Sequence, residues 1–207
     1  MRTIIYVDGF NLYFGALKGT PYKWLDLKCL FTKILEPHNQ IVCIKYFTAP
    51  VSGNLSDPDK ATHQSAYLAA LKHCTPEMRI YFGQFTTHEI TAKLVTPILG
   101  QRHAKISRTT EKGSDVNLAV HLLNDAWLDA YDCAIVVSGD SDLAEAMRLV
   151  KTHHQKIVGV IVPGKRGMSK ELIQLADFVR KIRTSALAGS QFPAVIPNTN
   201  IHKPSDW

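Results

Sequence analysis

The chain has 207 residues, of which 45% are hydrophobic and 20% charged, with 24 Lys and Arg against 18 Asp and Glu. This composition is typical of a globular protein and excludes a largely disordered chain. No apolar run approaches the roughly 20 residues of a membrane-spanning helix, and the N-terminal apolar run is too short for a signal peptide, so we expect no membrane association.

Short apolar segments alternate with helical patterns along the chain. Runs rich in β-branched residues predict strands at 3–7, 41–47, 78–85, 133–137 and 157–162. Helical periodicity predicts helices at 11–17, 26–35, 60–73, 114–127, 142–153 and 169–179. Residues 86–112 contain Thr, Ile and Val around Pro97 and Gly100, which favours β-structure without defining its arrangement. This alternation predicts an α/β fold with a mainly parallel sheet covered by helices on both faces.

Four polar residues are expected to cap helices, namely Asn11, Asp26, Ser114 and Asp142. The helix after Ser114 is expected to use one apolar face, formed by Val116, Ala119, Val120, Leu123 and Trp127. From residue 184 the chain is polar, contains three Pro and lacks periodicity, so 184–207 is expected to be a loosely held tail beside a domain formed by 1–183.

The net charge of +6 is unevenly distributed. Residues 151–183 hold eight basic residues and two acids, and the rest of the chain holds sixteen of each sign. Residues 113–145 carry seven acids and no Lys or Arg, and they follow the basic window 101–112. Solvated helix faces explain part of this pattern, and the other interpretation is a carboxylate site beside a surface for a polyanion.

Carboxylates follow the ends of predicted strands. Asp8 follows the first strand, Asp140 and Asp142 follow the strand at 133–137, and Asp115 opens a helix. Strand C-termini and the following helix N-termini share one edge of a parallel sheet, where ligands bind, so these four side chains can converge. Clustered carboxylates repel one another unless a cation compensates, and their oxygens suit Mg²⁺ or Mn²⁺. Helix capping remains the alternative explanation for Asp142 and Asp115.

Two further polar residues accompany the carboxylates. The Asn11 amide can cap a helix or support the site, and Ser138 can close a turn or hydrogen-bond a carboxylate. The four cysteines form no CxxC motif and no Cys/His pair at zinc spacing, so we expect reduced thiols and a cytoplasmic protein.

Three segments together resemble the signatures of the NYN domain, the LabA-like branch of the PIN-like nuclease superfamily. They are Tyr6-Val7-Asp8-Gly9-Phe10-Asn11-Leu12-Tyr13, Lys112-Gly113-Ser114-Asp115-Val116 and Val136-Val137-Ser138-Gly139-Asp140-Ser141-Asp142. The resemblance covers roughly residues 1–183 and implies a PIN-like three-layer sandwich with metal-dependent ribonuclease activity. It matches Asp8, Asp115, Asp140 and Asp142 to the family's acidic pocket and Asn11 to its neighbouring polar residue. Relatives also carry an aromatic residue and a Pro soon after the last acid, whereas Leu143-Ala144-Glu145-Ala146 stands here.

The resemblance implies an endoribonuclease in which Asp8, Asp115 and Asp140 hold Mg²⁺ or Mn²⁺, and Asp142 completes the set or orients the attacking water. RNA is the expected partner, a homodimer is compatible with the family, and six basic residues are expected to contact phosphates: Lys112, Arg102, Lys105, Arg108, Lys165 and Arg166. The alternative is a catalytically weak or inactive module that binds RNA or protein and retains the acidic pocket. A receiver-like or phosphatase-like domain with Asp8 as phosphoacceptor ranks below both, because no second Asp accompanies Asp8 at the end of the first strand.

Overall fold

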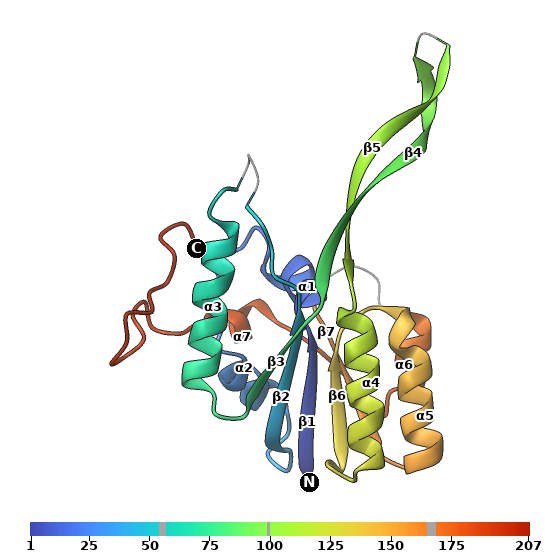
Figure 1. The fold of residues 1–207 in the computed structure, drawn as a ribbon. Helices are drawn as coiled ribbons and strands as arrows, with labels where there is room; N and C mark the ends of the chain where they lie inside the picture. The colour runs from blue at the N-terminus through green and yellow to red at the C-terminus, as the bar shows by residue number, and fades with distance from the viewer. Residues whose placement is uncertain (54–56, 99, 165–168) are drawn as a thin grey trace.

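A six-stranded sheet forms the centre of the molecule (Figure 1). The computed structural model describes residues 1–53, 57–98, 100–164 and 169–207. The strand order is β3-β2-β1-β6-β7-β8, and all neighbouring pairs are parallel, as the sequence predicts. The strands are β1 (Arg2–Asp8), β2 (Gln40–Thr48), β3 (Met78–Phe82), β6 (Cys133–Val137), β7 (Ile157–Val162) and β8 (Phe178–Lys181).

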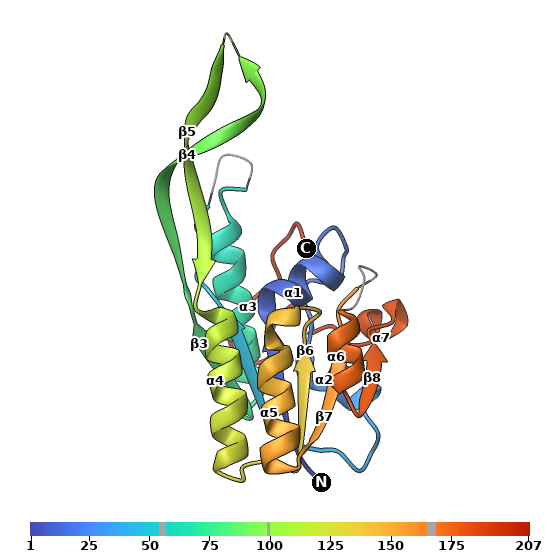
Figure 2. The ribbon, with the colours of Figure 1, turned by 90° about the vertical axis from the view of Figure 1, so that its right-hand side faces the viewer.

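Helices cover both faces of this sheet, which gives the predicted three-layer α/β/α sandwich (Figures 1 and 2). One layer contains α1 (Gly9–Leu12), a π-helical turn (Tyr13–Leu17), α2 (Leu27–Ile34), α3 (Lys60–Cys74) and α7 (Thr184–Ala188). The other contains α4 (Ser114–Trp127), a 3₁₀ turn (Ser141–Leu143), α5 (Ala144–His154) and α6 (Lys170–Leu175). Within the described residues, no helix has the length and apolar character needed to cross a membrane.

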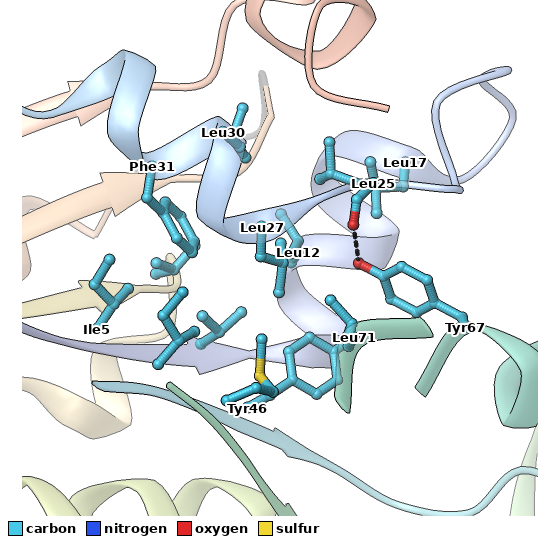
Figure 3. Packing of buried hydrophobic residues seen from close by; sticks show 14 of the residues in the cluster. Ile5, Leu12, Leu17, Leu25, Leu27, Leu30, Phe31, Tyr46, Tyr67 and Leu71 are labelled. Carbon is cyan, nitrogen blue, oxygen red and sulfur yellow. Dashed lines mark hydrogen bonds between the residues drawn. The ribbon is translucent and has the colours of Figure 1, made fainter. Parts of the chain in front are cut away.

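Each face of the sheet contributes to its own apolar cluster. Ile5 and Val7 pack into the cluster beneath α2 and α3, whereas Ile4 and Tyr6 pack beneath α4 and α5, because successive strand side chains point to opposite faces. Figure 3 shows the first cluster, in which the Tyr67 hydroxyl donates a hydrogen bond of 2.9 Å to the backbone oxygen of Leu25. Burial on both faces explains why these strands are continuous apolar runs in the sequence.

The chain between β3 and α4 forms a separate two-stranded antiparallel ribbon, residues 84–112, which we call the arm. Its strands are β4 (Gln84–Ile98) and β5 (Gln101–Lys112), and in the sheets of the described residues they pair only with each other. The arm projects well beyond the body of the molecule (Figures 1 and 2). The sequence predicts β-structure here without its arrangement, and the structure shows that the two strands pair as an antiparallel hairpin.

Two predicted helix caps are displaced along the chain. Asp8, rather than Asn11, caps α1, because its side chain accepts a hydrogen bond from the Asn11 backbone N–H at 2.9 Å. Asp140, rather than Asp142, caps the 3₁₀ turn and accepts from the Asp142 N–H at 3.0 Å. In both places the carboxylate at the strand end also opens the next helix. The predicted cap at Asp26 is confirmed.

Helix α4 differs from the prediction in its N-cap residue and in the side that it turns to the core. Gly113 occupies its N-cap with φ +96°, a conformation that favours glycine, and the helix starts at Ser114. The buried face consists of Leu118, Leu122, Asp125 and Ala126. Most of the apolar residues predicted to face the core are therefore on the solvent side, with Val116 66%, Val120 57% and Trp127 78% exposed.

The C-terminal region also departs from the prediction. The helix expected at 169–179 ends at Leu175, and the following residues form β8, which pairs with β7. The segment 184–207 is not loosely held: α7 and the chain after it bury Leu187, Phe192 and Ile196 in the first apolar cluster. The Trp24 indole N–H donates to the backbone oxygen of Pro193 at 2.9 Å, which ties this segment to the domain.

Candidate active site

Asp8 stands at the end of the central strand with 5% of its surface exposed. Its Oδ1 accepts the Asn11 N–H at 2.9 Å, and its Oδ2 accepts the Ser138 hydroxyl at 3.0 Å. Burial raises the pKa of this carboxyl above its usual value, the two hydrogen bonds oppose that rise, and the charge of Asp140 adds to it. Asp8 is thus a buried acid whose orientation is fixed by two donors.

The loop after β6 is fastened to the end of β1 by side chains that the sequence singles out. Ser138 Oγ donates to Asp8 and accepts the Asp140 backbone N–H at 3.1 Å. The Asn11 side-chain oxygen accepts the Gly139 N–H at 3.1 Å. These bonds hold Asp8 and Asp140, which lie 132 positions apart in the printed sequence, at one edge of the sheet.

Gly9 follows Asp8 because the turn from β1 into α1 runs against the neighbouring strand. A Cβ at position 9 would lie 2.7 Å from the Tyr46 ring and 2.8 Å from the backbone oxygen of Phe47. A side chain there would displace β1 from β2 or rotate Asp8 away from Ser138.

Asp115 lies in the first turn of α4 and faces the same edge. Its pKa is raised to about 6, first by burial and then by the negative charges of Asp8, Asp140, Glu111 and Asp142. Glu111 at the end of β5 accepts the Ser114 N–H at 3.1 Å and the Ser114 hydroxyl at 2.8 Å, so it anchors the start of α4. The neighbouring negative charges thus favour the protonated form of Asp115, and a cation bound among these carboxylates would relieve their repulsion.

A cleft of about 540 Å³ opens at this edge of the sheet. It is lined by residues from both halves of the chain: Asp8, Phe10, Asn11, Phe14, Gly15, Lys60, Phe85, Glu111, Asp115, Gly139, Asp140, Val162 and Pro163. The structure therefore brings three of the four predicted acids, together with Asn11, into one cavity. Asp142 is exposed and is absent from the described lining.

The donor set of this cleft suits a hard cation in its chemistry. Asp8, Asp115 and Asp140 supply carboxylate oxygens, which Mg²⁺ and Mn²⁺ prefer. Among the described residues, no three Asp, Glu, His or Cys side chains are grouped as a formed metal site. The carboxylates thus share a cleft without being drawn together around one point.

The predicted RNA-binding residues are spread over the arm. Arg102, Lys105, Arg108 and Lys112 all belong to β5 and do not line the cleft. Lys165 and Arg166 lie outside the described residues.

Sequence reasoning missed several contributors to the cleft, among them Lys60, Glu111 and Phe85. Lys60, at the start of α3, is the basic residue of the described lining. Glu111 and Phe85 come from the root of the arm. Their surroundings in the sequence give no signal, because Lys60 reaches the cleft through the direction of α3, and Phe85 and Glu111 reach it through the direction in which β4 and β5 leave the sheet. The Phe85 ring packs edge-on against Phe10 at 5.7 Å, which fastens the root of the arm to α1.

Comparisons with known proteins extend these observations. The family model described as NYN domain matches residues 2–183. The whole chain aligns, at 34% identity, with 75% of a Pseudomonas putida (strain DSM 28022 / S16) protein named 6-hydroxy-3-succinoylpyridine 3-monooxygenase HspA. A solved protein of unknown function from Vibrio parahaemolyticus RIMD 2210633 is similar in fold, with a TM-score of 0.58, 19% identity, and coverage of 88% of this chain and 93% of that one.

Proposed function

The chain belongs to the NYN domain family, and from this membership and its carboxylate cleft we propose that it is a Mg²⁺- or Mn²⁺-dependent endoribonuclease of the LabA-like branch of PIN-like nucleases. The NYN domain implies a nuclease-type fold, and the three sequence motifs support the branch. The observation that carries the proposal is the convergence of Asp8, Asp115 and Asp140 in one cleft. We further propose that the protein acts in the cytoplasm, in agreement with its four free cysteines.

The cleft residues divide into ion-holding and positioning groups. Asp8, Asp115 and Asp140 would hold the ion, and the hydrogen bonds from Ser138 and from the Asn11 backbone fix the direction of the Asp8 carboxylate. When bound, Mg²⁺ or Mn²⁺ neutralises charge on the phosphate and lowers the pKa of water for attack on phosphorus. The exposed position of Asp142 suits an outer role in orienting water rather than direct contact with the ion.

The phosphate of the substrate needs cations beside this acidic cleft. Lys60 lines the cleft and can neutralise a phosphate oxygen next to the carboxylates. The face of the arm that begins with Phe85 and Glu111 continues outward through Thr91 and Lys105, which oppose each other across the ribbon. This polar face provides a route for a strand leaving the cleft.

Cleavage assays on the purified full-length protein test the proposal. Labelled single-stranded and hairpin RNAs, with Mg²⁺, Mn²⁺ or a chelator, should show metal-dependent cleavage that leaves 5′-phosphate ends. Asp8→Asn and Asp140→Asn should each abolish it, while Glu36→Gln, at an exposed carboxylate that pairs with Arg180, should not. Cleavage that survives both Asp substitutions, or fails with every metal, would refute the nuclease assignment.

A non-catalytic module is the alternative outcome of the same assays. Such a module would keep the family fold and the same carboxylate cleft without turnover. RNA binding that persists with chelator, without turnover at any metal concentration, would favour it.

A second candidate activity, hydroxylation of a pyridine ring, is suggested by the relative named a 6-hydroxy-3-succinoylpyridine 3-monooxygenase. Phe10, Phe14 and Phe85 line the cleft and could pack against a small aromatic ring. Oxygenation at C3 of that pyridine has to displace the succinoyl group, so incubation with oxygen, reduced nicotinamide and flavin should consume oxygen and reductant and yield a dihydroxypyridine together with the released side chain as its aldehyde. The same incubation without new product would exclude this activity for the tested substrate.

A further inference from the structure

Three phenylalanines line the cleft beside its charged residues. Phe10, Phe14 and Phe85 share the lining with the acids of the site and with Lys60. Phe is among the residues most often fully buried, yet Phe14 is 53% exposed and Phe85 is 38% exposed. A hard cation takes oxygen ligands and gains nothing from aromatic neighbours. The two exposed rings are therefore available to a part of the ligand other than the phosphate at the ion.

The π-helical turn holds Phe14 at the rim of the cleft. This turn packs closely on the chain after β7, because a Cβ at Gly15 would lie 2.4 Å from the backbone oxygen of Pro163. The rings of Tyr13 and Phe14 meet at 78° with their centres 5.3 Å apart, and Lys18 Nζ lies 5.0 Å from the centre of the Phe14 ring. Phe14 is thus a positioned ring with a cation beside it, a combination that suits the base and the phosphate of a nucleotide.

The root of the arm holds Phe85. It is the second residue of β4 and lies opposite Glu111 of β5. Its ring meets the ring of Phe10 at 75°, with the centres 5.7 Å apart, while more than a third of the residue stays exposed. A ring that is already fixed loses little conformational freedom when a ligand packs on it. Phe85 therefore provides a second preformed aromatic surface at the cleft.

The two exposed rings lie on opposite sides of the acids. The strand order places β2, β1 and β6 between β3 and β7. Asp8 ends β1, and Asp140 follows β6. Phe85 follows β3, whereas Phe14 belongs to the turn that packs beside the end of β7. Four strand spacings of about 4.8 Å separate β3 from β7 by about 19 Å. A ligand that crosses the acids along this edge therefore meets one ring on each side.

An unpaired RNA strand matches this arrangement. It joins phosphates, which a bound cation and Lys60 attract, to bases whose faces stack on aromatic side chains. In a duplex the bases stack on one another, and the grooves expose their edges rather than their faces. The cleft volume of about 540 Å³ is also that of a site for a small molecule rather than for a double helix. The exposed rings therefore favour nucleotides that are free of base pairing.

We propose, on the basis of the nuclease function proposed above, that Phe14 and Phe85 each stack on one unpaired base, on opposite sides of the scissile phosphate. Both are positioning residues, because the rings hold the bases and do not touch the reacting phosphorus. Fixing the strand at two points presents the phosphate between them to the acids. Since every base has an aromatic face, the rings select for unpaired nucleotides at both positions and not for a particular sequence.

Fluorescence of 2-aminopurine, which is quenched by stacking, tests the two contacts separately. The probe is moved one position at a time along a short unpaired RNA that binds full-length Asp140→Asn protein with Mn²⁺, so that the RNA stays intact. Two positions on either side of a phosphate should change their fluorescence on binding. Adding Phe14→Ala should remove the change at one of them, and adding Phe85→Ala should remove it at the other. Loss at both positions from either substitution, or at neither from both, would overturn the proposal.

Affinities measured on the same RNA distinguish stacking from simple apolar contact. Phe14→Ala and Phe85→Ala should each weaken binding by about tenfold, Phe→Leu at either position should weaken it nearly as much, and Phe→Trp should retain it. The matched control is Phe82→Ala, because Phe82 is 47% exposed, has Lys72 Nζ 6.0 Å from its ring centre and is absent from the described lining. Circular dichroism confirms that each variant is folded, and the leucine variants keep the bulk that packs at the root of the arm.

Duplex RNA and the wild-type protein complete the test. Binding of a duplex with the same sequence should not respond to either substitution, and an equal loss for duplex and single strand would overturn the proposal. Cleavage by the wild type is measured in parallel: cleavage with binding that is insensitive to both substitutions would refute the base contacts and leave the nuclease function intact. Ring-dependent quenching without cleavage would support the base contacts and refute the nuclease function. Displacement of the RNA by an equal concentration of a free pyridine would assign the rings to a small molecule and overturn the proposal.

Discussion

Ser138 and Asp8, 130 residues apart in the sequence, are joined by a hydrogen bond of 3.0 Å from the serine hydroxyl to the buried aspartate. The same hydroxyl accepts the backbone N–H of Asp140 at 3.1 Å. One oxygen atom therefore sets the relative positions of two acids that come from different strands. The sequence allows Ser138 to close a turn or to hydrogen-bond a carboxylate, and the bond to Asp8 confirms the second role.

Replacing Ser138 with Ala should affect both stability and activity. Asp8 would keep its burial but lose a donor, so its pKa should rise further and the free energy of unfolding should fall by about 1–3 kcal/mol. Urea denaturation measures the loss, and RNA cleavage at saturating metal measures the misplacement of Asp8. Ser141→Ala, at an exposed position of the next turn, is the control. Equal effects of the two substitutions would contradict the role given to Ser138.

Asp115 provides a pH-dependent prediction. Its folded pKa of about 6 lies above the 3.8 of an ordinary Asp, so the folded state retains a proton that the unfolded state has lost, and stability falls as the pH rises through this window. Asp115→Asn should therefore raise the melting temperature at pH 7.5 by a few degrees, about 2–4 °C for each kcal/mol gained, and have little effect at pH 3.5. Thermal melts across this range measure the difference, and an equal shift at both pH values would contradict the electrostatic cause.

Metal binding should reverse that cost. Mn²⁺ should raise the melting temperature of the wild type, because an ion that binds only the folded state stabilises it. The rise should be smaller for Asp115→Asn, which lacks one charged donor. Samples that contain chelator and no added metal define the baseline melting temperature. Equal Mn²⁺-induced rises in the two proteins would show that Asp115 does not bind the ion.

The two faces of the arm should differ in their contribution to RNA binding. Lys105 lies on the polar face that continues from the cleft, whereas Arg102 lies on the same side as Ile106. Lys105→Gln should weaken oligonucleotide binding and lower the slope of its salt dependence by about one, the value expected for one lost phosphate contact. Arg102→Gln removes the same charge and should change both quantities less. Binding titrations at several salt concentrations compare the two variants. Equal salt-dependence slopes would mean that both faces of the arm contribute equally to RNA binding.

The C-terminal segment should contribute measurably to stability. Phe192 is 6% exposed and its ring packs against Trp24 at 6.0 Å between ring centres, so Phe192→Ala should lower the free energy of unfolding by about 3–5 kcal/mol. Val195, which is 49% exposed, supplies the control substitution Val195→Ala, with an expected effect below about 1 kcal/mol. Denaturant melts separate the two. Equal, small losses would mean that the segment does not complete the core.

The strands of the central sheet could be predicted closely because burial on both faces favours apolar residues in them, most completely in Cys133–Val137. Helix α4 could not be oriented in the same way. Its Leu118, Leu122 and Ala126 recur at the same helical spacing as its exposed Val116, Val120 and Trp127, so periodicity alone does not distinguish the core side.

The site shows the same division between local and long-range signals. Asp8, Asp115 and Asp140 could be found because each adjoins a strand end or a helix start, where the topology dictates convergence. Glu111 and Lys60 could not, since their approach depends on the direction in which the arm and α3 leave the sheet. The prediction of a final helix through Val179 failed because Phe178–Lys181 gains hydrogen bonds to β7, which a sequence pattern does not report.

β1 and β6 pair in the middle of the sheet. The strands on the β1 side precede the tip of the arm near Gly100 in the chain, and the strands on the β6 side follow it. Asp8 and Lys60 belong to one side, and Asp115 and Asp140 to the other. Each portion of the chain carries only a half-site. The proposed catalysis should therefore need both portions: a chain cut at the arm tip has to reassemble its two pieces along β1 and β6 before the carboxylates can meet.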